Sequence, residues 1–433
     1  MKLPIAPVAA ASRRSLPIVG DSRAVDRAAR PIYVVWEVTL QCDLACRHCG
    51  SRAGRARPDE LDTAQALDVV AQLADLQVLE VTLIGGEAYL REDWPQIVRA
   101  IRARGMDCSI TTGGRGLTRE RAQQAADAGV QSVSVSFDGL ERTHDGLRGV
   151  RGSFAAAMSA VEHLHEAGVT VNANTQIGRA SVREIPALFD LLAGSGIRAW
   201  QMQLTVPMGR AADRPELVIE PYQMLEVMPM LARVRRRADE TGVKLWPGNN
   251  IGYFGPYESL LRGGFPAGHG TGCGAGRSVL GLEANGDVKG CPSLPTADYV
   301  GGNVRDASLR TIWEQTAPLR FTRDRTVDEL WGYCRGCYYA ETCMAGCSWT
   351  SHVTFGKRGN NPFCHHRALE LLSVGKRERL VKRAAAGGEP FDHGRFEIVL
   401  EDWPAEELAG ARAIASSGEG WLPIPAPVLE PLP

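Results

Sequence analysis

Three cysteines stand in one short loop, Cys42, Cys46 and Cys49, at the spacing C-x3-C-x2-C. They follow the apolar run 32–38, which has the composition of a β-strand. Three thiolates are one short of closing a tetrahedral site, so an iron–sulfur cluster held by them keeps one iron open to a small molecule. Structural zinc is the alternative, but it usually has four closed ligands, and His48 as the fourth would be crowded between two cysteines. The spacing therefore favours a cluster that takes part in chemistry.

Seven further cysteines follow from residue 273 onward: Cys273, Cys291, Cys334, Cys337, Cys343, Cys347 and Cys364. Seven thiols exceed what one tetrahedral metal needs and approach the requirement of two clusters with four thiolates each. The remaining cysteine, Cys108, lies in an apolar run and is expected to be a small buried hydrophobe. We find no secretory signal before the first apolar run, which favours reduced thiols and metal binding over disulfides.

The composition narrows the class of protein. The chain has 433 residues, with 49 Lys and Arg against 50 Asp and Glu, for a net charge of −1. Such a balance creates no field that favours nucleic acid or an anionic membrane. The length allows a large core, and no apolar run reaches transmembrane length. We expect a soluble, cytoplasmic metalloprotein with no nucleic-acid or membrane partner.

Short β-rich runs alternate with amphipathic helical stretches between residues 31 and 204. Strands are expected at 32–38, 78–84, 106–111, 131–136, 170–176 and 198–204, with helices near 63–76, 93–104, 119–128, 154–167 and 182–194. Six β/α units in order predict an α/β fold with a parallel sheet, which curves into an open, partial (β/α)6 barrel. A doubly wound sheet is the alternative, but no G-x-G-x-x-G motif follows the first strand.

Polar residues mark the carboxyl ends of the strands, where the cysteine loop also lies and where chemistry collects in such barrels. The second strand ends in Gly85-Gly86-Glu87, in which two glycines permit close backbone approach and a carboxylate follows. Thr112 ends the third strand, and Ser134, Ser136 and Asp138 alternate along the end of the fourth. Ordinary turns would also account for these residues. Their common place at the strand ends predicts a ligand pocket.

The cysteine loop and these strand ends together resemble the radical S-adenosylmethionine (radical SAM) superfamily. The resemblance implies that Cys42, Cys46 and Cys49 hold a 4Fe-4S cluster that binds S-adenosyl-L-methionine (SAM), with His48 at a commonly aromatic position. Gly85-Gly86-Glu87 would hold the methionine amino group, although Ala88 replaces the usual Pro. The SAM-contacting residues implied further are Thr112, Ser134, Ser136, Asp138 and Arg148, the last meeting the methionine carboxylate. The resemblance also implies cleavage of SAM to a 5′-deoxyadenosyl radical that abstracts hydrogen from a substrate.

The later cysteines resemble the SPASM extension of radical SAM peptide maturases. The pattern C-x9-15-G-x4-C is met by Cys273, Gly286 and Cys291, and C-x2-C-x5-C-x3-C by residues 334–347. The resemblance implies two auxiliary clusters, expected to be 4Fe-4S. One would be held by Cys334, Cys337, Cys343 and Cys364, and the other by Cys273, Cys291 and Cys347. Some members have an eighth cysteine where this chain has 276–279, so one cluster is expected to have an open or non-cysteine ligand.

Five regions are expected along the chain: an N-terminal arm (1–30), the radical SAM partial barrel (31–245), a linker or substrate loop (246–272), the SPASM domain (273–370), and a C-terminal helix with a flexible tail (371–433). The loop carries Asn249, Asn250, Tyr253, Tyr257 and His269, and is either a lid or substrate channel or a linker. Further expected elements are a helix at 220–241, a hairpin at 282–288, a short helix through Leu309 and Trp313, a helix from Glu370 to Ala386, and a mobile end from Trp421 to Pro433.

The resemblance to ribosomal-peptide maturases implies a ribosomally made precursor peptide as substrate, which receives an oxidative cross-link or a similar modification. Pro292 follows Cys291 where sulfatase-maturing relatives have an Asp base, which argues against that oxidation. Two alternatives stay open: a SPASM oxidoreductase or epimerase acting on a small molecule or a peptide α-carbon, and an electron carrier or sensor, although a carrier needs no open iron. The implied partners are the peptide, a separate peptide-recognition protein and a one-electron reductant of the flavodoxin or ferredoxin type.

Overall fold

The computed structural model describes residues 16–432, and its centre is a sheet of ten strands in the order β10-β9-β8-β1-β2-β3-β4-β5-β6-β7. The first seven strands are β1 (Tyr33–Glu37), β2 (Glu80–Ile84), β3 (Asp107–Thr112), β4 (Ser132–Ser136), β5 (Thr170–Ile177), β6 (Ala199–Leu204) and β7 (Lys244–Pro247). Each neighbouring pair among them is parallel. The prediction of a parallel α/β partial barrel is confirmed, and β7 is a strand that the sequence reading missed.

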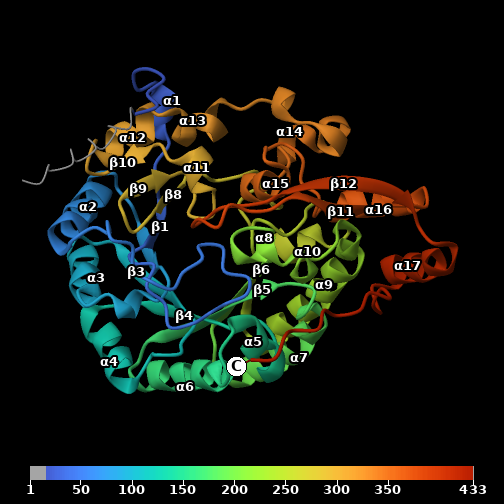
Figure 1. Ribbon diagram of the computed structural model, residues 1–433, viewed down its shortest axis with the longest axis horizontal. Helices are drawn as coiled ribbons and strands as arrows, with labels where there is room; N and C mark the ends of the chain where they lie inside the picture. Colours follow the sequence, from blue (N-terminus) through green and yellow to red (C-terminus); the bar gives the residue numbers. More distant parts are fainter. Residues whose placement is uncertain (1–15, 433) are drawn as a thin grey trace, which may run out of the picture.

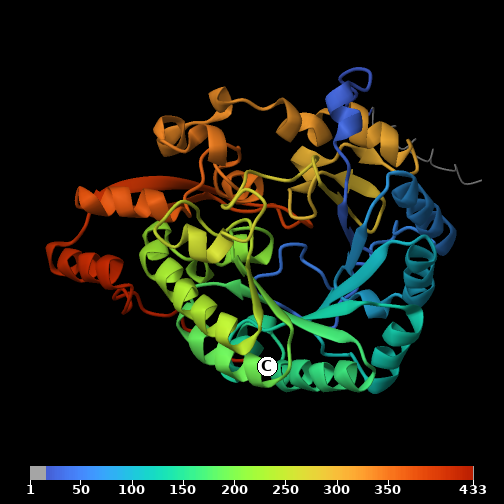
Figure 2. The same cartoon turned by 180° about the vertical axis from the view of Figure 1, so that it is seen from behind.

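Helices form the outer wall of this barrel and enclose its strands in an arc (Figures 1 and 2). They are α2 (Thr63–Asp75), α3 (Trp94–Ala103), α4 (Arg119–Ala128), α5 (Glu141–Arg148), α6 (Ser153–Glu166), α7 (Ile185–Gly194) and α9 (Met224–Thr241). The apolar stripe of α2 is buried at Val69, Val70 and Leu73. Asp62 caps its N-terminus, because the Asp62 carboxylate accepts a hydrogen bond from Gln65 N at 2.8 Å. The periodic apolar face thus places each helix against the sheet.

The cysteine-rich segment continues the barrel sheet. Strand β8 (Val279–Leu282) pairs in parallel with β1, opposing Val279 to Tyr33, and β9 (Asp287–Lys289) pairs antiparallel with β8. The turn between them contains Gly286 at a φ of +87°, as expected of a hairpin. The remaining elements of this segment are β10 (Gly302–Asn303), α11 (Thr296–Tyr299), α12 (Leu309–Gln315), α13 (Ala317–Asp324), α14 (Ala340–Cys343), α15 (Ser348–Phe355) and α16 (His365–Ser373). They lie across the side that the barrel helices leave open (Figure 1).

Two further segments pack on this body. The described part of the N-terminal arm forms α1 (Ala24–Ala28), whose buried Asp26 carboxylate pairs with Arg320 at 2.9 Å and Arg323 at 2.8 Å. Residues 1–15 of the predicted arm lie outside the described part of the chain. The segment between β7 and the first cysteine of the later group contains α10 (Glu258–Arg262), where buried Arg262 binds the Glu258 carboxylate at 2.9 Å. That segment is therefore folded against its neighbours.

The predicted helix from Glu370 to Ala386 is wrong. Only α16 is helical there, and after Gly375, at a φ of +71°, the chain enters β11 (Lys376–Ala384), which pairs antiparallel with β12 (Arg395–Asp402). Good helix formers fill this stretch, but cross-strand ion pairs from Arg377 and Arg379 to Glu401 stabilise the hairpin instead. Tertiary pairing has overridden local propensity.

The C-terminal tail, expected to be mobile, packs along the barrel after α17 (Ala405–Ser417). Leu422 N donates to the buried Glu226 carboxylate at 2.6 Å, and Arg183 donates to the carbonyl of Leu422 at 2.6 Å. The tail then runs back to the region of α5 (Figure 1), where Leu429 lies against Gly146. Specific hydrogen bonds thus fix most of its course.

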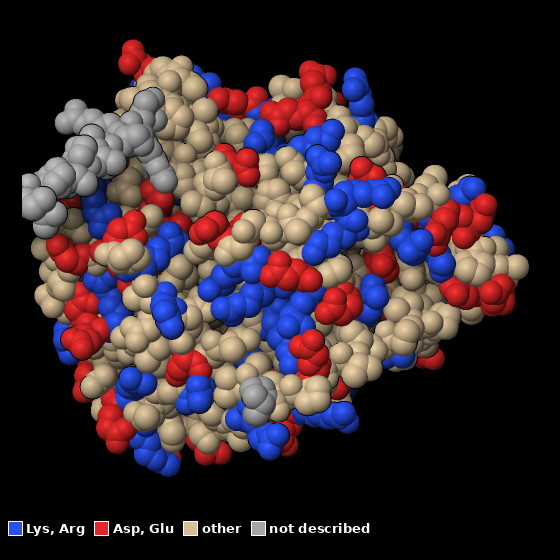
Figure 3. All heavy atoms as spheres, viewed as in Figure 1, with Lys and Arg blue, Asp and Glu red and all other residues tan. Residues whose placement is uncertain are grey.

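The surface carries charges of both signs. Lys and Arg side chains gather near the middle of the face viewed in Figure 1, with acidic side chains around and between them (Figure 3). Among the helices of residues 16–432, none is both long enough and apolar enough to cross a membrane.

Candidate functional site

A cleft at the carboxyl ends of β1 to β6 brings most of the predicted site residues together. Its lining includes ten of the twelve residues predicted for the cluster and SAM: Cys42, Cys46, Cys49, His48, Gly85, Gly86, Glu87, Thr112, Ser136 and Arg148. The other two, Ser134 and Asp138, are not part of the lining. Ser134 points the same way as Ser136 but stands two residues deeper along β4. Asp138 is fully buried behind the cleft wall.

The two glycines after β2 let the chain pass close to the cysteine loop. A Cβ on Gly85 would lie 2.2 Å from the Thr39 carbonyl oxygen, and one on Gly86 would lie 2.1 Å from that of Gln41. This approach allows Gly86 N to donate to Thr39 O and Glu87 N to donate to Gln41 O, both at 2.8 Å. The glycines therefore fix the cysteine loop to the end of β2, which is a structural role for the motif.

Glu87 is a buried carboxylate that two neighbours orient. One oxygen accepts a hydrogen bond from the Thr112 hydroxyl, and the other accepts one from Gly113 N at 2.6 Å. Burial raises the pKa of Glu87 from 4.5 to about 7, against the lowering effect of these two donors. A cation bound beside this carboxylate in the cleft would strongly stabilise its ionised form.

Asp138 holds two of the lining residues in place. One of its oxygens lies 2.9 Å from His48 Nε2 and 2.7 Å from Arg148 Nη2, while its other oxygen accepts a hydrogen bond from Gln176 N at 2.8 Å. Burial acts to raise the pKa of Asp138, but the charges of Arg148 and His48 hold it below the ordinary value. Asp138 is thus an ionised positioning residue behind the cleft wall.

The end of α5 supports the cysteine loop from the other side. Ala45 N donates to Arg148 O at 3.1 Å and Arg47 N donates to Leu147 O at 2.7 Å, so loop amides satisfy the last carbonyls of the helix. The helix ends at Gly149, where φ is +71° and a Cβ would meet the Ala45 carbonyl at 2.4 Å. Arg148 therefore reaches the cleft because its helix ends against the loop.

Several lining residues are not among the predicted site residues. Asn174 and Gln176 alternate at the end of β5, a signal that the strand-end rule could have found. Met208 follows β6, and its sulfur accepts a hydrogen bond from Trp349 Nε1 at 2.9 Å. Trp349 lies two residues after Cys347, and nothing in the barrel motifs pointed to it. Its side chain borders both this cleft and the pocket of Cys347.

The later cysteines gather in two pockets that match the two predicted sets. Cys334, Cys337, Cys343 and Cys364 line one, which aromatic side chains including Tyr253 and Phe254 cover. Cys273, Cys291 and Cys347 line the other, together with Asn249, Asn250 and Ser293. At the place of the possible eighth cysteine, Val279 lines this second pocket and supplies no metal ligand. Of the loop residues 247–272 singled out earlier, none lines the SAM cleft.

Several of the thiols in these three groups are poor acids as they stand. Burial and the charge of Glu87 raise the pKa of Cys42 to about 12, and burial raises that of Cys46 to about 11 against the charge of Arg148. Burial and Cys273 raise the pKa of Cys291 to about 12. Crowded, buried thiols become thiolates when a metal cation neutralises them. The donor sets, three, four and three thiols, therefore fit iron–sulfur clusters. Cys108 stands apart from these groups, buried in β3.

Comparison with known proteins identifies the family. The radical SAM superfamily model matches residues 36–192, and the iron-sulfur cluster-binding SPASM model matches residues 273–338. Mycofactocin maturase MftC of Mycobacterium tuberculosis is 30% identical over 381 residues, covering 86% of this chain and 91% of that protein. The chain belongs to the radical SAM superfamily. It is a radical SAM/SPASM enzyme, so its cofactors are a SAM-binding 4Fe-4S cluster, SAM and auxiliary iron–sulfur clusters.

Other radical SAM proteins resemble it as well. AdoMet-dependent heme synthase of Nitratidesulfovibrio vulgaris is 29% identical over 361 residues, covering 78% of this chain and 93% of that protein. Among solved structures, anSMEcpe with bound AdoMet and a peptide superposes with a TM-score of 0.63 at 15% identity, over 78% of this chain and 94% of that one. Streptococcus suis SuiB bound to precursor peptide SuiA gives a TM-score of 0.60 at 17% identity, over 77% and 75% of the two chains. These structures share its fold.

Proposed function

We propose that this radical SAM/SPASM enzyme acts on a ribosomally made precursor peptide and introduces an oxidative cross-link at an unactivated carbon. The observation that carries the proposal is the likeness to mycofactocin maturase MftC, at 30% identity over 86% of this chain. The likeness extends through both the barrel and the cysteine-rich segment, so it covers the parts that would bind SAM and substrate.

Residues in and behind the cleft lining have separate roles in this proposal. Cys42, Cys46 and Cys49 hold the cluster, the Glu87 carboxylate binds the ammonium of SAM, and Arg148 binds its carboxylate. When bound, the cluster and SAM supply a 5′-deoxyadenosyl radical that abstracts hydrogen from the substrate. The chain contributes orientation: Asp138 fixes Arg148 and His48, while Thr112 and Gly113 fix Glu87.

An oxidative cross-link requires the substrate to lose one more electron after the hydrogen atom. The residues that would hold the acceptor are Cys273, Cys291 and Cys347, because their pocket is the one that shares Trp349 with the SAM cleft. The four cysteines of the other pocket lie behind Tyr253 and Phe254. We therefore assign the substrate to the side of the cleft that Trp349 borders.

The proposed partners are the precursor peptide, a separate peptide-recognition protein and a one-electron reductant of the flavodoxin or ferredoxin type. The test is co-expression of the enzyme with a short peptide encoded beside its gene, followed by mass spectrometry of the peptide. We expect a product lighter by two hydrogens per cross-link, and no change with the Cys42→Ala variant. A product of unchanged mass in ordinary water, which takes up deuterium at an α-carbon when it is made in heavy water, would instead show epimerisation.

The heme synthase relatives support a second candidate, oxidation of a small tetrapyrrole. Their identity is close to that of the maturase, at 29% over 78% of this chain for the Nitratidesulfovibrio vulgaris protein. Incubating the reduced enzyme with SAM and a tetrapyrrole precursor of heme separates the two candidates. Consumption of the tetrapyrrole with no change in any co-expressed peptide would replace the peptide proposal.

A further inference from the structure

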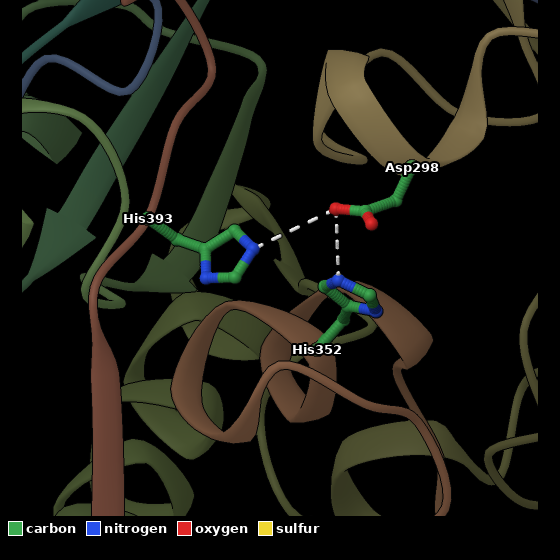
Figure 4. A group of neighbouring side chains, drawn as sticks. All are labelled: Asp298, His352 and His393. Carbon is green, nitrogen blue, oxygen red and sulfur yellow. Dashed lines mark hydrogen bonds and ion pairs between the residues drawn. The ribbon is translucent and has the colours of Figure 1, made fainter. Parts of the chain in front are cut away.

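Three side chains far apart in the sequence converge outside the clusters and the SAM cleft. Asp298 comes from α11, His352 from α15 and His393 from the loop before β12, and Figure 4 shows all three pointing toward one another. One Asp298 carboxylate oxygen lies 3.1 Å from His352 Nε2 and 3.7 Å from His393 Nε2. The potential ligand atoms all lie within 4.8 Å of one another.

The other nitrogen of each imidazole ring already has a partner. His393 Nδ1 lies 2.7 Å from the Gly394 carbonyl, which can only accept, so Nδ1 carries the hydrogen and Nε2 keeps its lone pair in the neutral ring. His352 Nδ1 lies 3.0 Å from the Tyr299 hydroxyl, which also accepts a hydrogen bond from Arg358 at 3.2 Å. Such contacts to the far nitrogen are how metal-binding histidines are oriented in proteins.

We propose that Asp298, His352 and His393 form a Zn²⁺ site. Two imidazole nitrogens and one carboxylate oxygen are ligands that zinc accepts, and water would complete a tetrahedron. Zinc–ligand bonds of about 2.0–2.2 Å require ligand atoms roughly 3.3 Å apart, which small side-chain rotations would reach from the present separations. Asp298 is 46% exposed at its side chain, while the two histidine side chains are 9% and 19% exposed, so an ion can enter from the solvent side.

The place of His393 gives this site a structural consequence. It stands in the loop between β11 and β12, which also touches the segment after the cysteine loop: Phe391 N donates to Gly50 O at 3.2 Å. The neighbouring Asp392 carboxylate binds Arg52 at 2.8 Å. A metal at His393 would therefore tie this loop to α11 and α15 and fix it beside the cysteine loop.

Zinc analysis of the full-length protein tests the site, with the clusters reconstituted anaerobically so that iron fills the cysteine sites. After incubation with Zn²⁺ and gel filtration, we expect about one zinc per chain, with only nitrogen and oxygen ligands near 2.0 Å in its X-ray absorption spectrum. His393→Gln and Asp298→Asn should each lose this zinc and keep their iron. His165→Gln, which changes an exposed histidine of α6, is the matched control and should keep both.

Three results would overturn the assignment: no retained zinc in the wild type, sulfur neighbours near 2.3 Å around the zinc, or unchanged zinc in both ligand variants. Hydrogen exchange supplies a readout besides metal content. Zinc should slow the exchange of amides in residues 388–394 of the wild type and leave them unchanged in His393→Gln. Equal exchange with and without zinc in the wild type would refute the link between this loop and the helices.

Discussion

Replacing Glu87 with Gln should weaken SAM binding and leave cluster content unchanged. The Glu87 carboxylate lines the cleft, is held by Thr112 and Gly113, and touches no cysteine ligand in these hydrogen bonds. Its proposed partner is the ammonium of SAM, and a hydrogen bond to a charged group contributes about 1.5–3 kcal/mol. The dissociation constant of SAM should therefore rise about ten- to hundred-fold in Glu87→Gln.

The same carboxylate gives SAM binding a pH dependence of known sign. The pKa of Glu87 is raised from 4.5 to about 7, so the group is mostly neutral below pH 7 and mostly ionised above it. The ammonium of SAM prefers the ionised form, so affinity should rise with pH, by roughly tenfold between pH 6 and pH 8. Glu87→Gln has no titrating group at this position, so its affinity for SAM should not show this rise with pH.

Equilibrium binding of SAM to anaerobically reconstituted, unreduced protein measures both effects, with iron content determined on the same samples. Glu80→Gln is the matched control, since Glu80 begins the same strand that Glu87 follows and does not line the cleft. The reasoning is refuted if Glu87→Gln binds SAM as tightly as the wild type, because Gly85-Gly86-Glu87 would then serve only to fix the cysteine loop.

Three further predictions concern the clusters and the N-terminal arm. Cys42→Ala should lower the iron content by about a third, if three complete clusters are bound, and abolish SAM cleavage, as iron analysis and chromatography of 5′-deoxyadenosine would show. Cys347→Ala should disrupt the pocket of three cysteines, which is proposed to hold the electron acceptor, and stop formation of modified peptide while release of 5′-deoxyadenosine partly survives; full product formation would contradict this. Asp26→Asn should destabilise the fold by about 3–5 kcal/mol in denaturant unfolding, because it leaves Arg320 and Arg323 buried without their shared charge. Arg23 and Arg323 lower the pKa of Asp26 below its ordinary 3.8 despite burial, so its contribution is present above pH 3.8 and is lost as the pH falls below that value.

The sequence predicted the barrel because short apolar runs typical of strands alternate along it with segments that have the apolar spacing of helices. Buried strands such as β1, with Tyr33 to Trp36, show as short apolar runs, and helices such as α2 carry an apolar stripe with a capping residue in front. The pattern failed for β7, a short strand whose Lys244 and Trp246 alternate with buried residues at the edge of the sheet. It also failed for β11, where charged helix formers pair across a hairpin that local composition does not reveal.

The candidate site was predictable where its residues belong to motifs at strand ends. The resemblance to the SPASM pattern grouped the later cysteines into the same sets that share pockets in the structure. Spacing could not reveal Trp349 at the border of two pockets, because that contact depends on how the cysteine-rich segment closes over the barrel. The convergence of Asp298, His352 and His393 was equally hidden, since their separations along the chain follow no metal-binding pattern.

Asp138 shows how the charge of the cleft is arranged. A pocket residue was expected there, but Asp138 lies behind Arg148 and neutralises it at 2.7 Å. Among the described residues, Glu87 is the only Asp or Glu of the cleft lining, so with Arg148 already balanced the Glu87 carboxylate is the one acidic side chain that faces the cleft outside the cysteine site. SAM carries a sulfonium, an ammonium and a carboxylate, for a net charge of +1. The buried pair of Asp138 and Arg148 thus leaves the Glu87 carboxylate to pair with the ammonium of SAM, as proposed above, while Arg148 keeps hydrogen-bond donors for the carboxylate of SAM.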